Sequence, residues 1–136
     1  MLTPKLIDEE GPEKVSKVNI NYTEKNIYCN WEEVKDLGTD NKIWVSLYNE
    51  QDKQISYSNT VNKNYASGVH KYIVEINGEE FEKYDDREFT IKREDLNNGI
   101  TMTKLYSIDN RGNKSNITNI PLIYALYLYC CVLSSI

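Results

Sequence analysis

Histidine and cysteine are scarce in this chain of 136 residues. There is one histidine, His70, and of the three cysteines two, Cys130 and Cys131, are adjacent near the end of the sequence. An odd number of cysteines with an adjacent pair defines no disulfide framework. A structural zinc site needs about four ligands at suitable spacing, and His70 is far from every cysteine. We therefore predict no metal and no cofactor.

Basic residues are also in the minority, which bears on the choice of partner. Lys and Arg number 16 against 21 Asp and Glu, for a formal net charge of -5. Domains that bind nucleic acid usually gather Lys and Arg on one face, so we expect no nucleic-acid partner. The frequent Asn and Lys, with eleven Tyr against two Phe, are typical of an AT-rich bacterial genome.

The sequence lacks any long apolar pattern with a helical period of 3.6 residues. Apolar and polar residues alternate instead, as they do in strands. Ile27, Cys29 and Trp31 show the period of two that marks half-buried strands, and turn signals follow about every 8 to 12 residues. Expected strands cover residues 18–22, 27–31, 42–48, 54–61, 72–76, 81–84, 88–92 and 100–109. The pattern predicts an all-β fold, an antiparallel β-sandwich of about seven to eight strands. Residues 93–96 form either one helical turn or a plain loop.

Both ends differ in composition from the predicted domain, residues 15–120. Residues 1–14 are acidic with two prolines and predict a flexible lead-in or linker; they carry no apolar core of a signal peptide. Residues 121–136 form an uncharged apolar tail. A final strand that continues past Ile120 into an aberrant end, from a truncated or frameshifted reading frame, fits this change best. A membrane anchor, which needs about 20 apolar residues, and a buried or partner-binding segment are the alternatives.

The polar residues offer no catalytic constellation. His70 has no Ser, Cys or Asp partner at a spacing that hydrolytic motifs require, and we interpret it as a solvent-facing strand residue. Adjacent acids, such as Glu32 with Glu33, are frequent in any acidic domain and are expected to be solvated. Four further carboxylates could supply oxygen ligands for calcium, but they follow no calcium-loop pattern. They are Asp36, Asp40, Asp85 and Asp86. We expect no enzyme.

The aromatic residues give the best candidates for ligand binding. Trp31 shares a strand face with Ile27 and Cys29, which predicts a core position between the two sheets. Trp44 alternates out of phase with its apolar neighbours and shares the opposite strand face with Tyr48. An exposed aromatic pair on a sheet can stack on sugars or hold a peptide, so Trp44 and Tyr48 are the predicted ligand-binding residues.

Three stretches of the chain resemble a known family. Asn26-Ile27-Tyr28-Cys29-Asn30-Trp31 is similar to a strand with a core tryptophan, Ser67-Gly68-Val69-His70-Lys71-Tyr72-Ile73-Val74 to an "S-G-V-x-x-Y" strand opening, and Leu105-Tyr106-Ser107-Ile108-Asp109-Asn110-Arg111-Gly112-Asn113-Lys114-Ser115 to a "D-x-A-G-N-x-S" hairpin. Their order resembles fibronectin type III or bacterial Ig-like modules of Gram-positive surface and secreted proteins. Two features depart from the family: an extra hairpin across residues 39–64, and Thr103 where a large apolar residue is usual.

The resemblance implies a non-catalytic accessory module, a spacer or adhesion domain, in a larger exported protein at the cell surface or outside the cell. Its partners would be neighbouring domains and, where it binds a ligand, a glycan or protein. A carbohydrate- or protein-binding sandwich that uses exposed aromatics is one alternative. A tail-anchored or phage-structural protein is another, although the short apolar tail makes a membrane partner the less favoured expectation.

Overall fold

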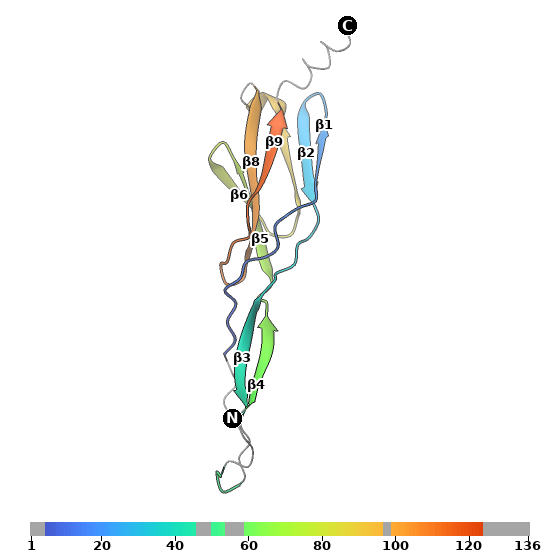
Figure 1. Ribbon diagram of the computed structural model, residues 1–136. Helices are drawn as coiled ribbons and strands as arrows, with labels where there is room; N and C mark the ends of the chain where they lie inside the picture. The colour runs from blue at the N-terminus through green and yellow to red at the C-terminus, as the bar shows by residue number, and fades with distance from the viewer. Residues whose placement is uncertain (1–4, 46–49, 54–58, 97–98, 124–136) are drawn as a thin grey trace.

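The protein is an all-β domain, as the alternating pattern predicts. The computed structural model describes residues 5–45, 50–53, 59–96 and 99–123. In these ranges nine strands and one short 3-10 helix follow one another (Figure 1). The elements are β1 (Val18–Tyr22), β2 (Asn26–Trp31), β3 (Thr39–Val45), β4 (Asn59–Tyr65), β5 (Val69–Ile76), β6 (Glu79–Lys83), β7 (Glu88–Lys92), the 3-10 helix η1 (Arg93–Asp95), β8 (Ile100–Asp109) and β9 (Thr118–Ile123).

Seven of the strands form two sheets that face each other. One sheet has the order β1-β2-β7 and the other β6-β5-β8-β9, and every pair is antiparallel. β5 and β6 are joined at Asn77 and Gly78, whose φ angles are 53° and 82°. Positive φ at both turn residues is what a tight hairpin requires, and it is the reason that the Asn-Gly pair predicts this reversal.

The hydrophobic core lies between the two sheets and confirms the prediction for Trp31. On β2, Ile27, Cys29 and Trp31 are at most 4 % exposed, and the opposite sheet contributes buried residues from β5, β8 and β9. The ring of Trp31 packs edge-to-face on Tyr72, with 5.5 Å between ring centroids. This contact joins the central strand of one sheet to an interior strand of the other.

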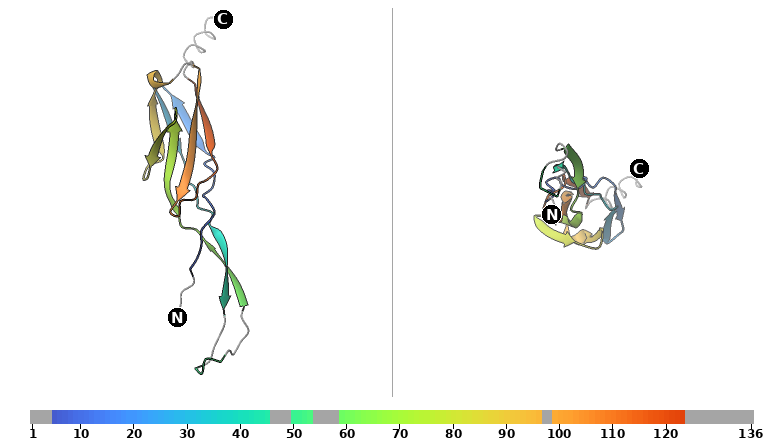
Figure 2. Two further views of the ribbon diagram at one scale, coloured as in Figure 1. Left: turned by 90° about the vertical axis from the view of Figure 1, so that its left-hand side faces the viewer. Right: turned by 90° about the horizontal axis from the view of Figure 1, so that it is seen from below.

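The remaining two strands form a ribbon that projects from the sandwich. β3 and β4 pair only with each other among the described strands, in a register that places Thr39 opposite Tyr65 and Val45 opposite Asn59. Both side views show this ribbon extending along the long axis of the molecule, away from the other seven strands (Figures 1 and 2). It corresponds to the hairpin that the sequence predicts across residues 39–64.

Residues 5–14, whose composition predicts a linker, make specific contacts with the body. The Glu13 N–H donates to the Lys35 carbonyl at 2.9 Å, and Pro12 forms an isolated β-bridge with Asp36. A Cβ atom added to Gly11 would lie 2.1 Å from the carbonyl oxygen of Lys114. This segment therefore runs close along the chain that leads to the ribbon and along the turn that follows β8.

The change in composition at Pro121, which separates the predicted domain from the apolar tail, falls inside a strand. β9 continues past Ile120 to Ile123 and pairs with β8 throughout, and Leu122 is fully buried. Residues 124–136, on which the expectations about the apolar tail depend, lie outside the described part of the chain. No helix within the described residues has the length and apolar character that a membrane span requires.

Candidate functional site

Three aspartates from distant parts of the sequence meet where the ribbon joins the sandwich. Asp8 comes from the N-terminal segment, Asp36 from the connection between β2 and β3, and Asp109 from the last position of β8. One carboxylate oxygen of each lies within 4.8 Å of those of the other two. Asp8 is 5 % exposed and Asp109 1 % exposed, and Asp36 is partly buried. We call this group the carboxylate cluster.

Backbone amides fix two of these carboxylates. The N–H and hydroxyl of Ser67 donate to Asp8 Oδ2 at 2.8 and 2.7 Å, and the Gly68 N–H donates to Asp36 Oδ2 at 2.9 Å. Gly68 has a φ of 93°, a conformation that side-chain-bearing residues rarely adopt. The turn before β5 thus presents two successive N–H groups to the cluster.

Asp109 is fixed by the turn that follows β8. Its Oδ1 accepts the N–H groups of Arg111 and Asn113 at 2.9 and 2.8 Å. The Asn113 side-chain amide donates to Asp109 Oδ2 at 2.9 Å and to the backbone carbonyl of Asp8 at 2.8 Å. Asn113 therefore connects the N-terminal segment by a hydrogen bond to the turn after β8, which Asp109 also stabilises.

Two carboxyl groups of the cluster, Asp8 and Asp36, have opposite pKa shifts. Burial raises the pKa of Asp8, but the hydrogen bonds from the Ser67 hydroxyl and N–H outweigh it, so that the pKa lies below its ordinary value. Burial, together with the nearby Asp8 and Asp109, raises the pKa of Asp36 despite the hydrogen bond from Gly68. The fold stabilises negative charge on Asp8 and disfavours it on Asp36.

The carboxylates weighed as calcium ligands from the sequence do not come together. Only Asp36 belongs to the cluster. Asp40 accepts a hydrogen bond from the Asn64 side chain at 3.0 Å, Asp86 pairs with Lys83 at 3.6 Å, and Asp85 is exposed. The sequence did not indicate Asp8, because it lies in a segment whose composition predicts a linker, or Asp109, because it lies in a stretch with the composition of a turn.

Of the two predicted ligand-binding aromatics, only Trp44 lies within the described residues. Trp44 is the sixth residue of β3 and stands opposite Thr60 of β4. Tyr48 lies outside the described residues, so the predicted pair is not tested. His70 is exposed on β5, as expected.

A second polar group lies on the outer surface of β5 and β6. Lys71 Nζ is 2.7 Å from Glu82 Oε1, and the Tyr84 hydroxyl donates to Glu82 Oε2 at 2.6 Å. The His70 and Tyr84 rings meet edge to face with centroids 5.3 Å apart. A strand irregularity between Val69 and Lys71 gives His70 and Lys71 access to the same ring. The group is mutually paired, which is typical of a solvated ion-pair network.

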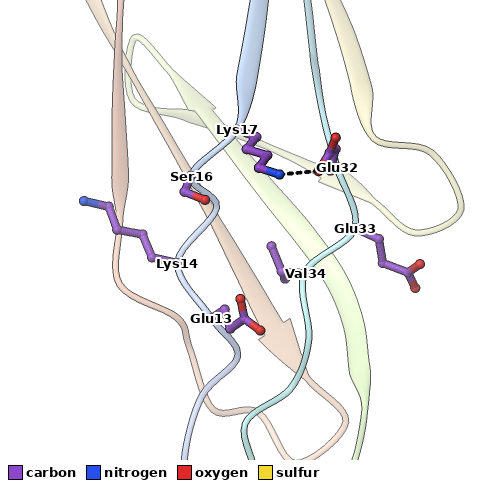
Figure 3. Close-up of a pocket in the computed structure, with 7 residues that line it drawn as sticks. All are labelled: Glu13, Lys14, Ser16, Lys17, Glu32, Glu33 and Val34. Carbon is purple, nitrogen blue, oxygen red and sulfur yellow. Dashed lines mark ion pairs between the residues drawn. The ribbon is translucent and has the colours of Figure 1, made fainter.

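One pocket of about 150 Å³ lies between the N-terminal segment and the chain that follows β2 (Figure 3). Across it Lys17 pairs with Glu32 at 3.5 Å, and both side chains are largely exposed. Pockets that bind small molecules are usually about 300 to 1,000 Å³ and mostly apolar, so this one makes a poor ligand site. It is lined by Glu13, Lys14, Ser16, Lys17, Glu32, Glu33 and Val34.

Comparisons with known proteins give no relative. No protein-family model matches the chain, and neither the curated proteins nor the solved structures contain a match.

Proposed function

We propose that this chain is a non-catalytic accessory module, a spacer or adhesion domain of a bacterial cell-surface or secreted protein, with a fibronectin type III or bacterial Ig-like fold. The observation that carries the proposal is the course of the chain through the sandwich. The described chain starts beside the ribbon and β9 ends at the opposite end of the molecule (Figure 1). A module with this geometry adds length to a row of domains.

The length that such a module adds can be worked out from β8. The N-terminal segment is held at the Asp109 end of this strand, where Asn113 bonds the Asp8 carbonyl. The exit strand pairs at the other end, with Ile123 opposite Ile100. β8 has ten residues, and a strand rises about 3.3 Å per residue. Entry and exit are therefore separated by roughly 30 Å along a strand that is paired on both sides.

The family resemblance supports the same proposal. Its three stretches cover β2 and parts of β5 and β8, and each of these strands lies between two partners in its sheet. The second and third stretches also meet, because the Asn110 side chain donates to the Ser67 carbonyl at 2.8 Å. The residues on which the resemblance depends thus lie on interior strands of the two sheets and where the ribbon joins the sandwich.

Small-angle X-ray scattering on the full chain tests the spacer proposal. A compact domain of this length has a radius of gyration of about 14 Å. A spacer is expected to give a clearly larger radius, with a distance distribution that has a long tail, and to keep both between 50 and 500 mM salt. A radius near that of a compact domain, or one that changes with salt, would contradict a fixed reach.

A second candidate function, binding of a glycan or protein, is favoured by the position of Trp44. The N-terminal segment hydrogen-bonds to Thr39 and Asn41 at the base of β3, but β4 pairs with no described strand other than β3, and its second edge can take a partner. Trp44→Ala is expected to abolish retention on an immobilised polysaccharide while the melting temperature stays unchanged. Tyr28→Ala, at a 40 % exposed aromatic of β2, is the control and should leave retention intact. Equal retention of both variants would reject Trp44 as a ligand contact.

A further inference from the structure

We propose that the carboxylate cluster of Asp8, Asp36 and Asp109 binds one Ca²⁺ ion, which fastens the N-terminal segment and the base of the ribbon to the sandwich. The inference is independent of the proposed spacer or adhesion function. It depends on the spacing of the oxygens, on one buried oxygen that has no hydrogen-bond donor, and on the charge of the surroundings.

The spacing suits a single ion. Ca²⁺ holds its oxygen ligands at about 2.3 to 2.6 Å, so two oxygens on opposite sides of the ion are about 5 Å apart. One oxygen from each aspartate lies within 4.8 Å of the other two, and all three therefore fit in one coordination sphere. Three carboxylates offer up to six oxygens, and water can complete the six to eight that Ca²⁺ takes.

One oxygen of the cluster has no hydrogen-bond donor. Asp36 Oδ1 is buried and unpartnered, while Asp36 Oδ2 accepts the Gly68 N–H at 2.9 Å. A buried carboxylate oxygen without a donor costs free energy, because it has lost its hydrogen bonds to water and gained none from the protein. This atom is a second indication, separate from the clustering of acids, that the site is built for a ligand that accepts electron pairs.

The negative charge of the cluster is not balanced by basic side chains. Three ion pairs join described residues, and they use Glu32, Glu82 and Asp86 rather than the cluster. Arg111, in the turn after β8, donates its backbone N–H to Asp109 but places its guanidinium over the Tyr65 ring, at 6.0 Å from the ring centroid. Like charges held this close repel strongly, and a divalent cation or a shared proton must offset the repulsion.

The donor set selects the kind of cation. It consists of oxygens, which hard cations prefer, and has neither thiolate nor imidazole, which would favour Zn²⁺ or Cu²⁺. Mg²⁺ usually keeps several waters and uses only one or two carboxylates. Three protein carboxylates on three separate segments correspond better to the larger number of protein oxygens and the adaptable coordination of Ca²⁺.

Binding at this position would change the stiffness of the junction. The three ligands come from the N-terminal segment, the entry to β3 and the end of β8, and the amides of Ser67 and Gly68 add the exit from β4. Four chain segments, including both connections between ribbon and sandwich, would then be held together at one ion. Removal of Ca²⁺ is expected to loosen the ribbon before it unfolds the two sheets.

Thermal unfolding of the full chain at pH 7 tests the proposal with CaCl₂ as the probe. The melting temperature in excess Ca²⁺, compared with EDTA, is expected to rise by about 10 °C at a hundredfold excess over the dissociation constant. Isothermal titration should give one ion per chain. Asp36→Asn should remove the response to Ca²⁺ and, because it relieves the repulsion, raise the melting temperature in EDTA. Asp85→Asn, at an exposed carboxylate outside the cluster, should retain the full response.

Several results would overturn the proposal. If the wild-type protein shows no response to Ca²⁺ while Asp36→Asn is more stable in EDTA, a shared proton offsets the repulsion. If Asp36→Asn keeps the response, Ca²⁺ acts on the acidic surface in general. An equal shift with MgCl₂ would reject Ca²⁺ as the ion that the cluster selects. The wild-type titration decides the matter even if a variant fails to fold.

Discussion

Thr103 gives the sharpest test of the core, because its hydroxyl is buried without a partner. The residue lies on β8 between Ile76 of β5 and Ile120 of β9, and its side chain is fully buried. Its Oγ1 has no hydrogen-bond partner. In Thr103→Val a methyl group of nearly the same shape replaces this hydroxyl.

The expected effect is stabilisation. Removing an unpaired buried hydroxyl relieves a penalty of about 1 to 3 kcal/mol, and the added methyl contributes about 0.8 kcal/mol of apolar burial. Small packing adjustments offset part of this sum, so we expect the free energy of unfolding to rise by about 1 to 2 kcal/mol. For a domain of this size that corresponds to roughly 3 to 8 °C in melting temperature.

Urea unfolding followed by tryptophan fluorescence measures the change directly. The midpoint should move to higher urea with an unchanged slope, since the surface exposed on unfolding stays the same. Thr103→Ser is the matched control: it keeps the hydroxyl and loses the methyl, and should lower stability by about 1 kcal/mol. If Thr103→Val lowers stability instead, the hydroxyl has a hydrogen-bond partner in solution and the reasoning from an unpaired group is wrong.

Two further predictions concern the N-terminal segment and the core. Gly11→Ala should destabilise the fold by about 1 to 3 kcal/mol, because its Cβ would lie 2.1 Å from the Lys114 carbonyl oxygen. Gly78→Ala, where the space is open and only a φ of 82° opposes the change, is the comparison in the same urea assay. A neutral Gly11→Ala would show that the segment is not held there. Burial raises the pKa of the Cys29 thiol to about 11, so alkylation of Cys29 at pH 8, followed by peptide mass mapping, should be at least a hundredfold slower in the native than in the urea-unfolded protein; comparable rates would contradict its burial.

The sequence predicts the sandwich well, because the interior strands carry strong signals. β2 is buried on one face and alternates cleanly, and β5 ends at the Asn77-Gly78 turn. An edge strand is less regular: in β1, Ile20 is 37 % exposed although its alternation with Val18 predicts burial. Edge strands have only one neighbour to pack on, so their pattern says less about which side chains are covered.

The carboxylate cluster could not be predicted from the sequence for a different reason. Asp8 and Asp109 are about a hundred residues apart, and an isolated Asp is indistinguishable from a solvated one until the fold places it. The acid pairs that attract attention in the sequence are adjacent, and adjacent residues of a strand point to opposite faces. The residues that do meet lie in the N-terminal segment, in the connection between β2 and β3, and at the end of β8, so no local pattern in the sequence relates them.

The contact of the N-terminal segment with the turn after β8 sets the order in which the molecule can fold. Asn113 bonds to Asp8 across a sequence separation of 105 residues, and the Tyr22 hydroxyl accepts the Ile123 N–H across 101. Closing such long loops costs entropy before any contact repays it, and proteins rich in such contacts fold slowly. During synthesis, the four-stranded sheet and the core between the two sheets cannot be completed until β8 and β9 have left the ribosome. The two strands of the ribbon are neighbours in sequence and pair only with each other among the described strands, so the ribbon can form without β8 and β9.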